Sequence, residues 1–169
     1  MGFEIERRFL VRGNGWRHLA VKHADIRQAY LTPGNKASVR VRISDNSTAT
    51  LTVKSRPAKL RRLELEYAIP TLEAEALIAL REGAVVEKRR YQVPCCGDLT
   101  WEIDVFLGEN LGLVIAEIEL RHEHQHMDLP PWIGLEVTGR PQYYNGFLAQ
   151  RPFSSWPSEV PAMPVERQA

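Results

Sequence analysis

The amino-acid sequence predicts a mainly β fold of the α+β type: an eight-stranded antiparallel closed β-barrel with a few flanking helices. About eight segments alternate apolar and polar residues with the period of two that is typical of strands. Most connections between these segments are short, which favours antiparallel neighbours. About eight strands are enough to close a barrel whose interior holds a ligand.

The strands are read from segments that lack Pro and Gly, because such segments form continuous secondary structure. Residues 37–44, with the sequence ASVRVRIS, alternate strictly, whereas residues 28–31 are the weakest candidate. The full set of predicted strands comprises residues 3–11, 28–31, 37–44, 48–55, 61–69, 84–93, 99–106 and 113–121.

One helix is clearly predicted between Thr71 and Gly83. Thr71 suits its N-cap, Glu73 suits its first turn, and Gly83 suits its end. Two further helices are expected, one at residues 14–23 between the first two strands and one at residues 142–150.

Length and composition indicate a single globular domain. The chain has 169 residues and a mass of 19.3 kDa. We assign residues 1–150 to the domain and the Pro-rich residues 151–169 to a C-terminal tail that is extended or disordered. The net charge of +1 argues against a general nucleic-acid or membrane binder. No apolar run approaches the ~20 residues of a transmembrane helix, so we expect a cytoplasmic protein with no membrane partner.

The cysteines and a group of three histidines do not point to a site. Cys95 and Cys96 are the only cysteines and are adjacent, so we interpret them as reduced thiols in a turn. His122, His124 and His126 alternate at the end of the last predicted strand, on the face opposite Glu117. We interpret them as a solvated strand end rather than a metal site.

The nearly cancelling charges are sorted rather than scattered. Because successive side chains of a strand point to opposite faces, each predicted strand can be divided into two faces. One face carries eight acids, at positions 4, 6, 64, 66, 102, 104, 117 and 119, and eight bases, at positions 8, 40, 42, 54, 62, 88, 90 and 121. A charged face of this kind is often the solvated side of a sheet.

Like charges on this face come in doublets within single strands, which favours a binding site instead. A carboxylate doublet offers the oxygen ligands that Mg²⁺ and Mn²⁺ take. A basic doublet suits the successive phosphates of a polyphosphate. Sixteen charges cannot share the narrow interior of a barrel without water, metal ions and a polyanion between them. The pattern therefore favours a site for a polyphosphate and a metal ion.

Several motifs follow one another in order from residue 3 to about residue 150. They are EIERRFLV at 4–11, QAYL at 28–31, VRVR at 39–42, TVK at 52–54, LELE at 63–66, EKRRY at 87–91, WEIDVF at 101–106, LVIAEIEL at 113–120 and GLEVTGRPQYYN at 134–145. This ordered set resembles the CYTH superfamily, the triphosphate tunnel metalloenzymes, and most of all its bacterial inorganic triphosphatases. The resemblance implies that residues 1–150 form an antiparallel tunnel that hydrolyses a linear triphosphate, most simply inorganic tripolyphosphate, with one or two Mg²⁺ or Mn²⁺ ions.

The resemblance also implies a role for each matching residue. It assigns the metal to Glu4, Glu6, Asp104, Glu117 and Glu119, and the phosphates to Arg8, Arg40, Arg42, Lys54, Lys88 and Arg90. It assigns catalysis to Glu4, Glu6, Arg8 and Tyr30, and a supporting role to Glu64, Glu66 and Glu102.

The chain departs from the family pattern at two places. The final Lys of the Glu-x-Glu-x-Lys signature is Arg8, which keeps the charge but cannot exchange a proton with Tyr30. Arg140 and Pro141 follow the EVT motif, where relatives tend to have an acidic residue, and we expect them to shape the tunnel mouth.

The sequence leaves other functions open. An adenylate cyclase, or a thiamine or nucleoside triphosphatase, of the same fold would use the same metal ions. A polyphosphate- or nucleotide-binding protein without turnover is the alternative from a different class, because Arg8 changes the signature. The apolar outer face of the barrel also invites a homodimer or a cover of helices.

Overall fold

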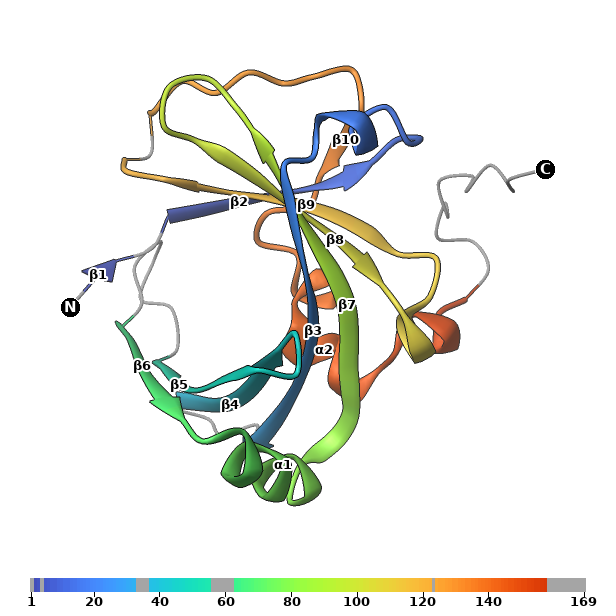
Figure 1. The fold of residues 1–169 in the computed structure, drawn as a ribbon. Helices are drawn as coiled ribbons and strands as arrows, with labels where there is room; N and C mark the ends of the chain where they lie inside the picture. The colour runs from blue at the N-terminus through green and yellow to red at the C-terminus, as the bar shows by residue number, and fades with distance from the viewer. Residues whose placement is uncertain (1, 4, 33–36, 56–62, 123, 158–169) are drawn as a thin grey trace.

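The structure, a computed structural model, describes residues 2–3, 5–32, 37–55, 63–122 and 124–157. Figure 1 shows one sheet that curls around an interior, with α1 (Thr71–Ala79) packed beneath β4 and β5. Glu4, one of the predicted metal ligands, and Arg62, a predicted inward-facing base, lie outside the described residues.

Ten strands form this single sheet in the described part of the chain. They are β1 (Gly2–Phe3), β2 (Ile5–Val11), β3 (Lys22–Thr32), β4 (Ala37–Ser44), β5 (Thr48–Ser55), β6 (Leu63–Ile69), β7 (Glu82–Pro94), β8 (Thr100–Phe106), β9 (Val114–Leu120) and β10 (Ile133–Glu136). Their order is β1-β6-β5-β4-β3-β7-β8-β9-β2-β10, and every pair is antiparallel. The mainly β, antiparallel prediction is confirmed, and every predicted strand has a counterpart.

The N-terminal segment pairs with strands from two distant parts of the sheet. β1 and β2 are successive parts of that segment, and β1 pairs with β6 whereas β2 pairs with β9. Within the described residues, however, β1 and β10 are the two edge strands of the sheet and do not pair with each other. The sheet is therefore curled, and its hydrogen bonding does not close it into the predicted barrel. β10 was not predicted because it has only four residues, and its register with β2 shifts between Ile133 and Glu136.

Helix α1 is shorter than the predicted helix. It starts directly after Pro70, so Thr71 is its first residue rather than its cap. Gly83 does not end it but lies inside β7, where its φ of +77° is a conformation that glycine adopts without a steric penalty.

The other two predicted helices are largely replaced by 3₁₀ turns. Residues 14–23 contain only the turn Arg17–Leu19, because β3 already starts at Lys22. Residues 142–150 divide into the end of the turn Pro141–Tyr143 and the short helix α2 (Asn145–Gln150). Further 3₁₀ turns lie at Gly108–Asn110 and Phe153–Ser155. None of the described helices has the length and apolarity needed to cross a membrane.

The start of the predicted tail packs on the domain. The ring of Trp156 lies 5.5 Å from that of Tyr143 and 5.1 Å from that of Phe153, between ring centroids. Aromatic packing of this kind orders residues 151–157, contrary to the prediction of an extended or disordered tail from residue 151 onward.

The outer face of the sheet carries most of the apolar core. Trp101 of β8 packs edge-to-face against Phe9 of β2 and against Trp132, which covers this face from the segment that precedes β10. Helix α1 covers the outer face of β4 and β5 with Ala74 and Ile78. On β6 the outer face stays more open, with Leu63, Leu65 and Tyr67 exposed.

The inner face is apolar only at one end, and α2 covers that end. Val86, Phe106 and Ile115 lie two positions along their strands from charged residues, and therefore on the same inner face. They form one cluster with Leu148 and Ala149 of α2. Helix α2 thus closes one end of the interior, and the residues that begin it lie against the remaining, charged part.

We expect Gly83→Ala to destabilise the protein strongly. A methyl group at Gly83 would lie 2.4 Å from the carbonyl oxygen of Ala149, in addition to the strain of a positive φ. Overpacking and strain together predict a loss of about 3 kcal/mol in the free energy of unfolding, measured by urea denaturation. Gly97→Ala is the matched control, since Gly97 has a φ of +61° but no atom near its missing side chain, and we expect it to lose about 1 kcal/mol. Equal losses for the two variants would contradict this account.

Candidate active site

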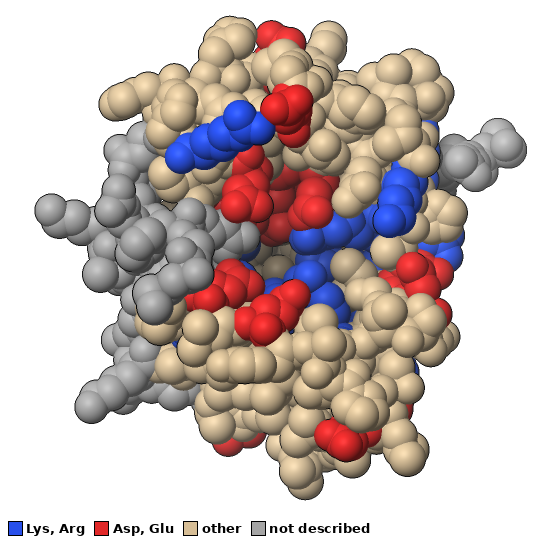
Figure 2. Space-filling view, turned by 60° about the vertical axis from the view of Figure 1, so that its left-hand side comes forward, with Lys and Arg blue, Asp and Glu red and all other residues tan. Residues whose placement is uncertain are grey.

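A large charged cavity occupies the interior of the curled sheet. Its volume is about 1290 Å³, and Figure 2 shows its mouth, with acidic side chains at the rim and basic side chains deeper inside. The predicted site residues that line it are Glu6, Arg8, Tyr30, Arg40, Arg42, Lys54, Glu64, Glu66, Arg90, Glu102, Glu117 and Glu119. Lys88 and Asp104 are fully buried beside it.

Strand register brings the acidic residues of β2, β8 and β9 together. Glu6 is directly opposite Glu119, and Glu117 is opposite both Arg8 on one side and Glu102 on the other. Because these positions have the same parity along their strands, their side chains share the inner face. The alternation of the sequence is therefore what gathers the carboxylates.

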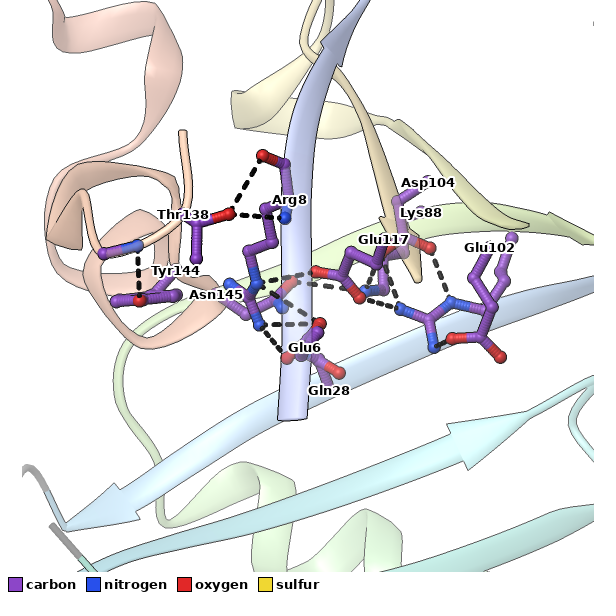
Figure 3. A network of polar contacts seen from close by, with 12 residues as sticks. Glu6, Arg8, Gln28, Lys88, Glu102, Asp104, Glu117, Thr138, Tyr144 and Asn145 are labelled. Atoms are coloured by element: carbon purple, nitrogen blue, oxygen red, sulfur yellow. Dashed lines mark hydrogen bonds and ion pairs between the residues drawn. The ribbon is translucent and has the colours of Figure 1, made fainter. Parts of the chain in front are cut away.

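Arg90 is the centre of an ion-pair network with three carboxylates, those of Glu102, Asp104 and Glu117, which Figure 3 labels. Its Nε and Nη2 atoms donate to the two carboxylate oxygens of Asp104, each at 2.7 Å. Nη2 also donates to Glu117 at 2.8 Å, and Nη1 donates to Glu102. One guanidinium therefore compensates three carboxylates.

Lys88 lies deepest in the network. Its ammonium donates to Asp104 and, at 3.3 Å, to the side-chain oxygen of Asn145 at the start of α2. Burial and the neighbouring Arg90 lower the pKa of Lys88 to about 8. Burial alone would raise the pKa of Asp104, but Arg90 and Lys88 outweigh it and keep that pKa below its ordinary value.

Arg8 joins the carboxylates to the segment that precedes α2. Its guanidinium donates to Glu6 at 3.0–3.2 Å, and its Nε lies 3.3 Å from a carboxylate oxygen of Glu117. The carbon at the centre of the guanidinium lies 4.4 Å from the centroid of the Tyr144 ring. The backbone N–H of Arg8 donates to the hydroxyl of Thr138 at 3.0 Å.

The two central carboxylates have opposite electrostatic environments. Burial, together with repulsion by Glu117, raises the pKa of Glu6 to about 7. Burial acts the same way on Glu117, but Arg8 and Arg90 outweigh it and hold the pKa of Glu117 far below its ordinary value. At neutral pH the acidic side of the cavity can therefore accept additional positive charge at Glu6.

The other side of the cavity carries Arg40, which lies 3.6 Å from Glu66, and Arg42. Arg42 donates to the side-chain oxygen of Gln28 at 3.1 Å, and Arg40 donates to the hydroxyl of Thr52 at 3.1 Å. Burial and the nearby Arg40 lower the pKa of Arg42 to about 10, so it stays charged at neutral pH but is repelled by its neighbours. Such a group of buried cations favours a bound polyanion.

Three buried donors of this site have no hydrogen-bond partner among the described residues. They are Nη1 of Arg8, Nε of Arg40 and Nε2 of Gln28. A buried N–H without a partner is costly, and a phosphate oxygen would satisfy it.

Elsewhere in the cavity Lys54 pairs with Glu64 at 2.6 Å, and Glu66 accepts from the hydroxyl of Thr52 at 3.0 Å.

The carboxylates have the chemistry of a site for a hard divalent cation, because all of them offer oxygen ligands. Glu6 and Glu119 are opposite each other on the neighbouring strands β2 and β9, and a cation would stabilise this pairing of like charges. In the described part of the chain, no three such side chains already surround one point. Arg8 and Arg90 lie among them, so a metal ion would have to replace these arginines as the partner of Glu117.

Sequence reasoning did not assign four residues that contact the site: Gln28, Thr138, Tyr144 and Asn145. Gln28 could have been found, because it alternates with Tyr30 on β3 and so shares its face. The other three follow β10 in turns and short helices, where no alternation marks a face.

The three histidines and the two cysteines lie in loops of the described chain. His122, His124 and His126 are exposed beyond the end of β9, as predicted for a solvated segment. Cys95 and Cys96 are not bonded to each other and lie in the turn between β7 and β8, with their sulfur atoms 3.7 Å apart.

Comparison with known proteins identifies the family. The profile of the CYTH domain matches residues 2–145. An inorganic triphosphatase of Acetivibrio thermocellus is 48% identical over 157 residues, which cover 92% of this chain and 99% of that protein. An inorganic triphosphatase of Nitrosomonas europaea is 35% identical over 150 residues, which cover 86% and 96%.

A solved structure agrees with this result. The crystal structure of the inorganic triphosphatase NE1496 superimposes with a TM-score of 0.64 at 34% identity, over 88% of this chain and 95% of that one. Since the family profile spans most of the chain and the relatives match along nearly their whole length, this protein belongs to the CYTH family.

Proposed function

We propose that this protein hydrolyses inorganic tripolyphosphate to phosphate and pyrophosphate in its charged cavity, with Mg²⁺ or Mn²⁺ as cofactor. The observation that carries the proposal is that one cavity combines a carboxylate cluster on β2, β8 and β9 with basic residues on β2, β4, β5 and β7. Both relatives described above are named inorganic triphosphatases, which supports the same reaction.

In this proposal the carboxylates hold the metal ion. Glu6, Glu117 and Glu119 would be its ligands, together with Glu4 and the deeper Asp104. A divalent ion bound there would neutralise charge on the phosphate oxygens and lower the pKa of a water molecule. The carboxylate of Glu6 would accept a hydrogen bond from the attacking water and orient it toward the terminal phosphorus.

The basic residues hold the triphosphate. Arg40, Arg42 and Arg90 would bind the phosphate oxygens. Arg8 and Lys54 also line the cavity and would extend this surface, and Lys88, buried beside it, would add positive charge. As the bond between the terminal phosphorus and the bridging oxygen breaks, negative charge develops on the leaving pyrophosphate. Cations held in the cavity would stabilise that charge, which is the usual basis of phosphoryl-transfer catalysis.

Binding would require the ion pairs of the cavity to exchange partners. Arg8 and Arg90 now contact Glu117, so both become available to phosphate when that carboxylate binds a metal ion. The acids and bases that pair with each other would therefore separate when the triphosphate and the metal ion bind together.

A panel of phosphate compounds tests the proposal. Tripolyphosphate, ATP, thiamine triphosphate and a longer polyphosphate are each assayed with Mg²⁺ and with Mn²⁺ for phosphate, pyrophosphate and cyclic AMP. We expect the highest kcat/KM for tripolyphosphate, with equimolar phosphate and pyrophosphate. Cyclic AMP from ATP would instead identify a cyclase, and tight tripolyphosphate binding without turnover would identify a binding protein.

A further inference from the structure

Arg8 is held in place by residues that are themselves proposed to change partners. Its guanidinium is held by Glu6 and Glu117, the same carboxylates that the metal ion is proposed to bind. When these carboxylates change partners, Arg8 loses both ion pairs. A long side chain without a fixed partner would lose its position. Part of the binding free energy of the triphosphate would then be lost in ordering the Arg8 side chain again.

Tyr144 provides a contact that does not depend on the carboxylates. Its ring lies on the side of Arg8 away from Glu6 and Glu117, as Figure 3 shows, with 4.4 Å between the guanidinium carbon and the ring centroid. A planar guanidinium stacks well on an aromatic ring, and the contact is stronger where water is excluded. The side chain of Arg8 is only 8% exposed, which is such an environment.

Tyr144 is itself held firmly in place. Its hydroxyl accepts a hydrogen bond from the backbone N–H of Gly139 at 3.2 Å. Its carbonyl accepts from the N–H groups of Phe147 and Leu148, at 2.9 and 3.0 Å, in the first turn of α2. Leu148 is fully buried in the cluster that closes the end of the cavity. These hydrogen bonds restrict where Tyr144, which is 37% exposed, can place its ring beside Arg8.

The contact leaves one donor of Arg8 available. Nη1 is buried and has no hydrogen-bond partner among the described residues, in a cavity built to hold an anion. We propose that Tyr144 is a positioning residue for Arg8, whose ring holds the guanidinium ready to bind a phosphate through Nη1 when Glu6 and Glu117 bind other partners. This inference rests on the proposed function, because it takes tripolyphosphate as the ligand.

A double-mutant cycle tests the proposal. Tyr144→Leu and Tyr144→Phe are made in the wild type and in an Arg8→Lys background. The affinity for tripolyphosphate is measured by calorimetry with Ca²⁺, a divalent cation that also takes carboxylate oxygens as ligands, and kcat and KM are measured with Mg²⁺. In the wild type we expect Tyr144→Leu to weaken tripolyphosphate binding and to lower kcat/KM by about tenfold. Tyr144→Phe, which keeps the ring, should recover most of both.

Repeating the Tyr144 substitutions in the Arg8→Lys variant makes the test specific to Arg8. With Arg8→Lys present, Tyr144→Leu should change the affinity by less than about twofold, because the planar partner of the ring is gone. Tyr67→Leu is the matched control: Tyr67 is exposed on the outer face of β6, and its loss should leave kcat, KM and affinity unchanged. The melting temperature of each variant is recorded with these values.

Each outcome has a definite meaning. Equal effects of Tyr144→Leu in both backgrounds would overturn the positioning role, since the loss would then not pass through Arg8. A Tyr144→Phe variant with the wild-type melting temperature that is as weak as Tyr144→Leu would overturn it too, because the ring by itself would then not position Arg8. If the wild type neither binds nor hydrolyses tripolyphosphate, the proposed function fails and the inference fails with it.

Discussion

Glu117→Gln is expected to lower kcat for tripolyphosphate by about 10³-fold, the scale of losing a central electrostatic group in an active site. Glu117 is buried between Arg8 and Arg90 and belongs to the proposed metal ligands. The amide keeps the shape of the side chain but removes the charge that both arginines and the metal ion would share. Initial rates of phosphate release with saturating Mg²⁺ measure the effect.

Glu75→Gln is the control for this variant. Glu75 lies on α1, where it pairs with Arg27 on the outside of the protein, and its side chain is 49% exposed. We expect wild-type kcat for Glu75→Gln, because surface ion pairs contribute little. If Glu117→Gln kept more than about a tenth of the wild-type rate, Glu117 would not have the central role proposed for it.

Arg90→Ala is expected to reduce both stability and activity. Arg90 donates to Asp104, Glu117 and Glu102, and Asp104 is fully buried. Removal of one partner from a buried ion pair leaves the other charge uncompensated, at a cost of about 3–5 kcal/mol. We expect a loss of this size in urea unfolding, and turnover near background even at temperatures where the variant is folded, because phosphate also loses a ligand.

The neighbouring Arg89 is the matched control for Arg90. It is on the same strand but faces outward, and it pairs with Asp25 at 2.6 and 2.9 Å on the surface. Arg89→Ala should leave kcat unchanged and alter the stability only slightly. Similar losses for Arg89→Ala and Arg90→Ala would contradict the view that the inner face alone carries the function.

The inner face of the sheet was predictable from the sequence because alternation is a property of each strand by itself. Arg40 and Arg42, or Glu117 and Glu119, share a face wherever their strands are placed. The sequence could not show that β9 lies between β2 and β8, and this arrangement places Glu117 among Arg8, Arg90 and Glu102. That neighbourhood depends on strand order, which local patterns do not contain.

The parts that were missed lie where regular patterns end. β10 is short and irregular, and residues 14–23 turn into β3 instead of forming a helix. Tyr144 and Asn145 reach the site only because α2 packs on the inner face of the sheet, a tertiary contact with no periodic signal. Resemblance to a known family supplied the roles of the charged residues, whereas the structure supplied their partners.

The central claim is that the carboxylates of the cavity work through a divalent metal ion. The most direct test is the initial rate of phosphate release from tripolyphosphate, first in excess EDTA and then after Mg²⁺ or Mn²⁺ is added beyond the chelator. We predict that the rate falls to background in EDTA and returns with the metal ion, because Glu117 and Glu119 are proposed to act as its ligands and the ion to lower the pKa of the attacking water. Hydrolysis that continues undiminished in EDTA would contradict the account.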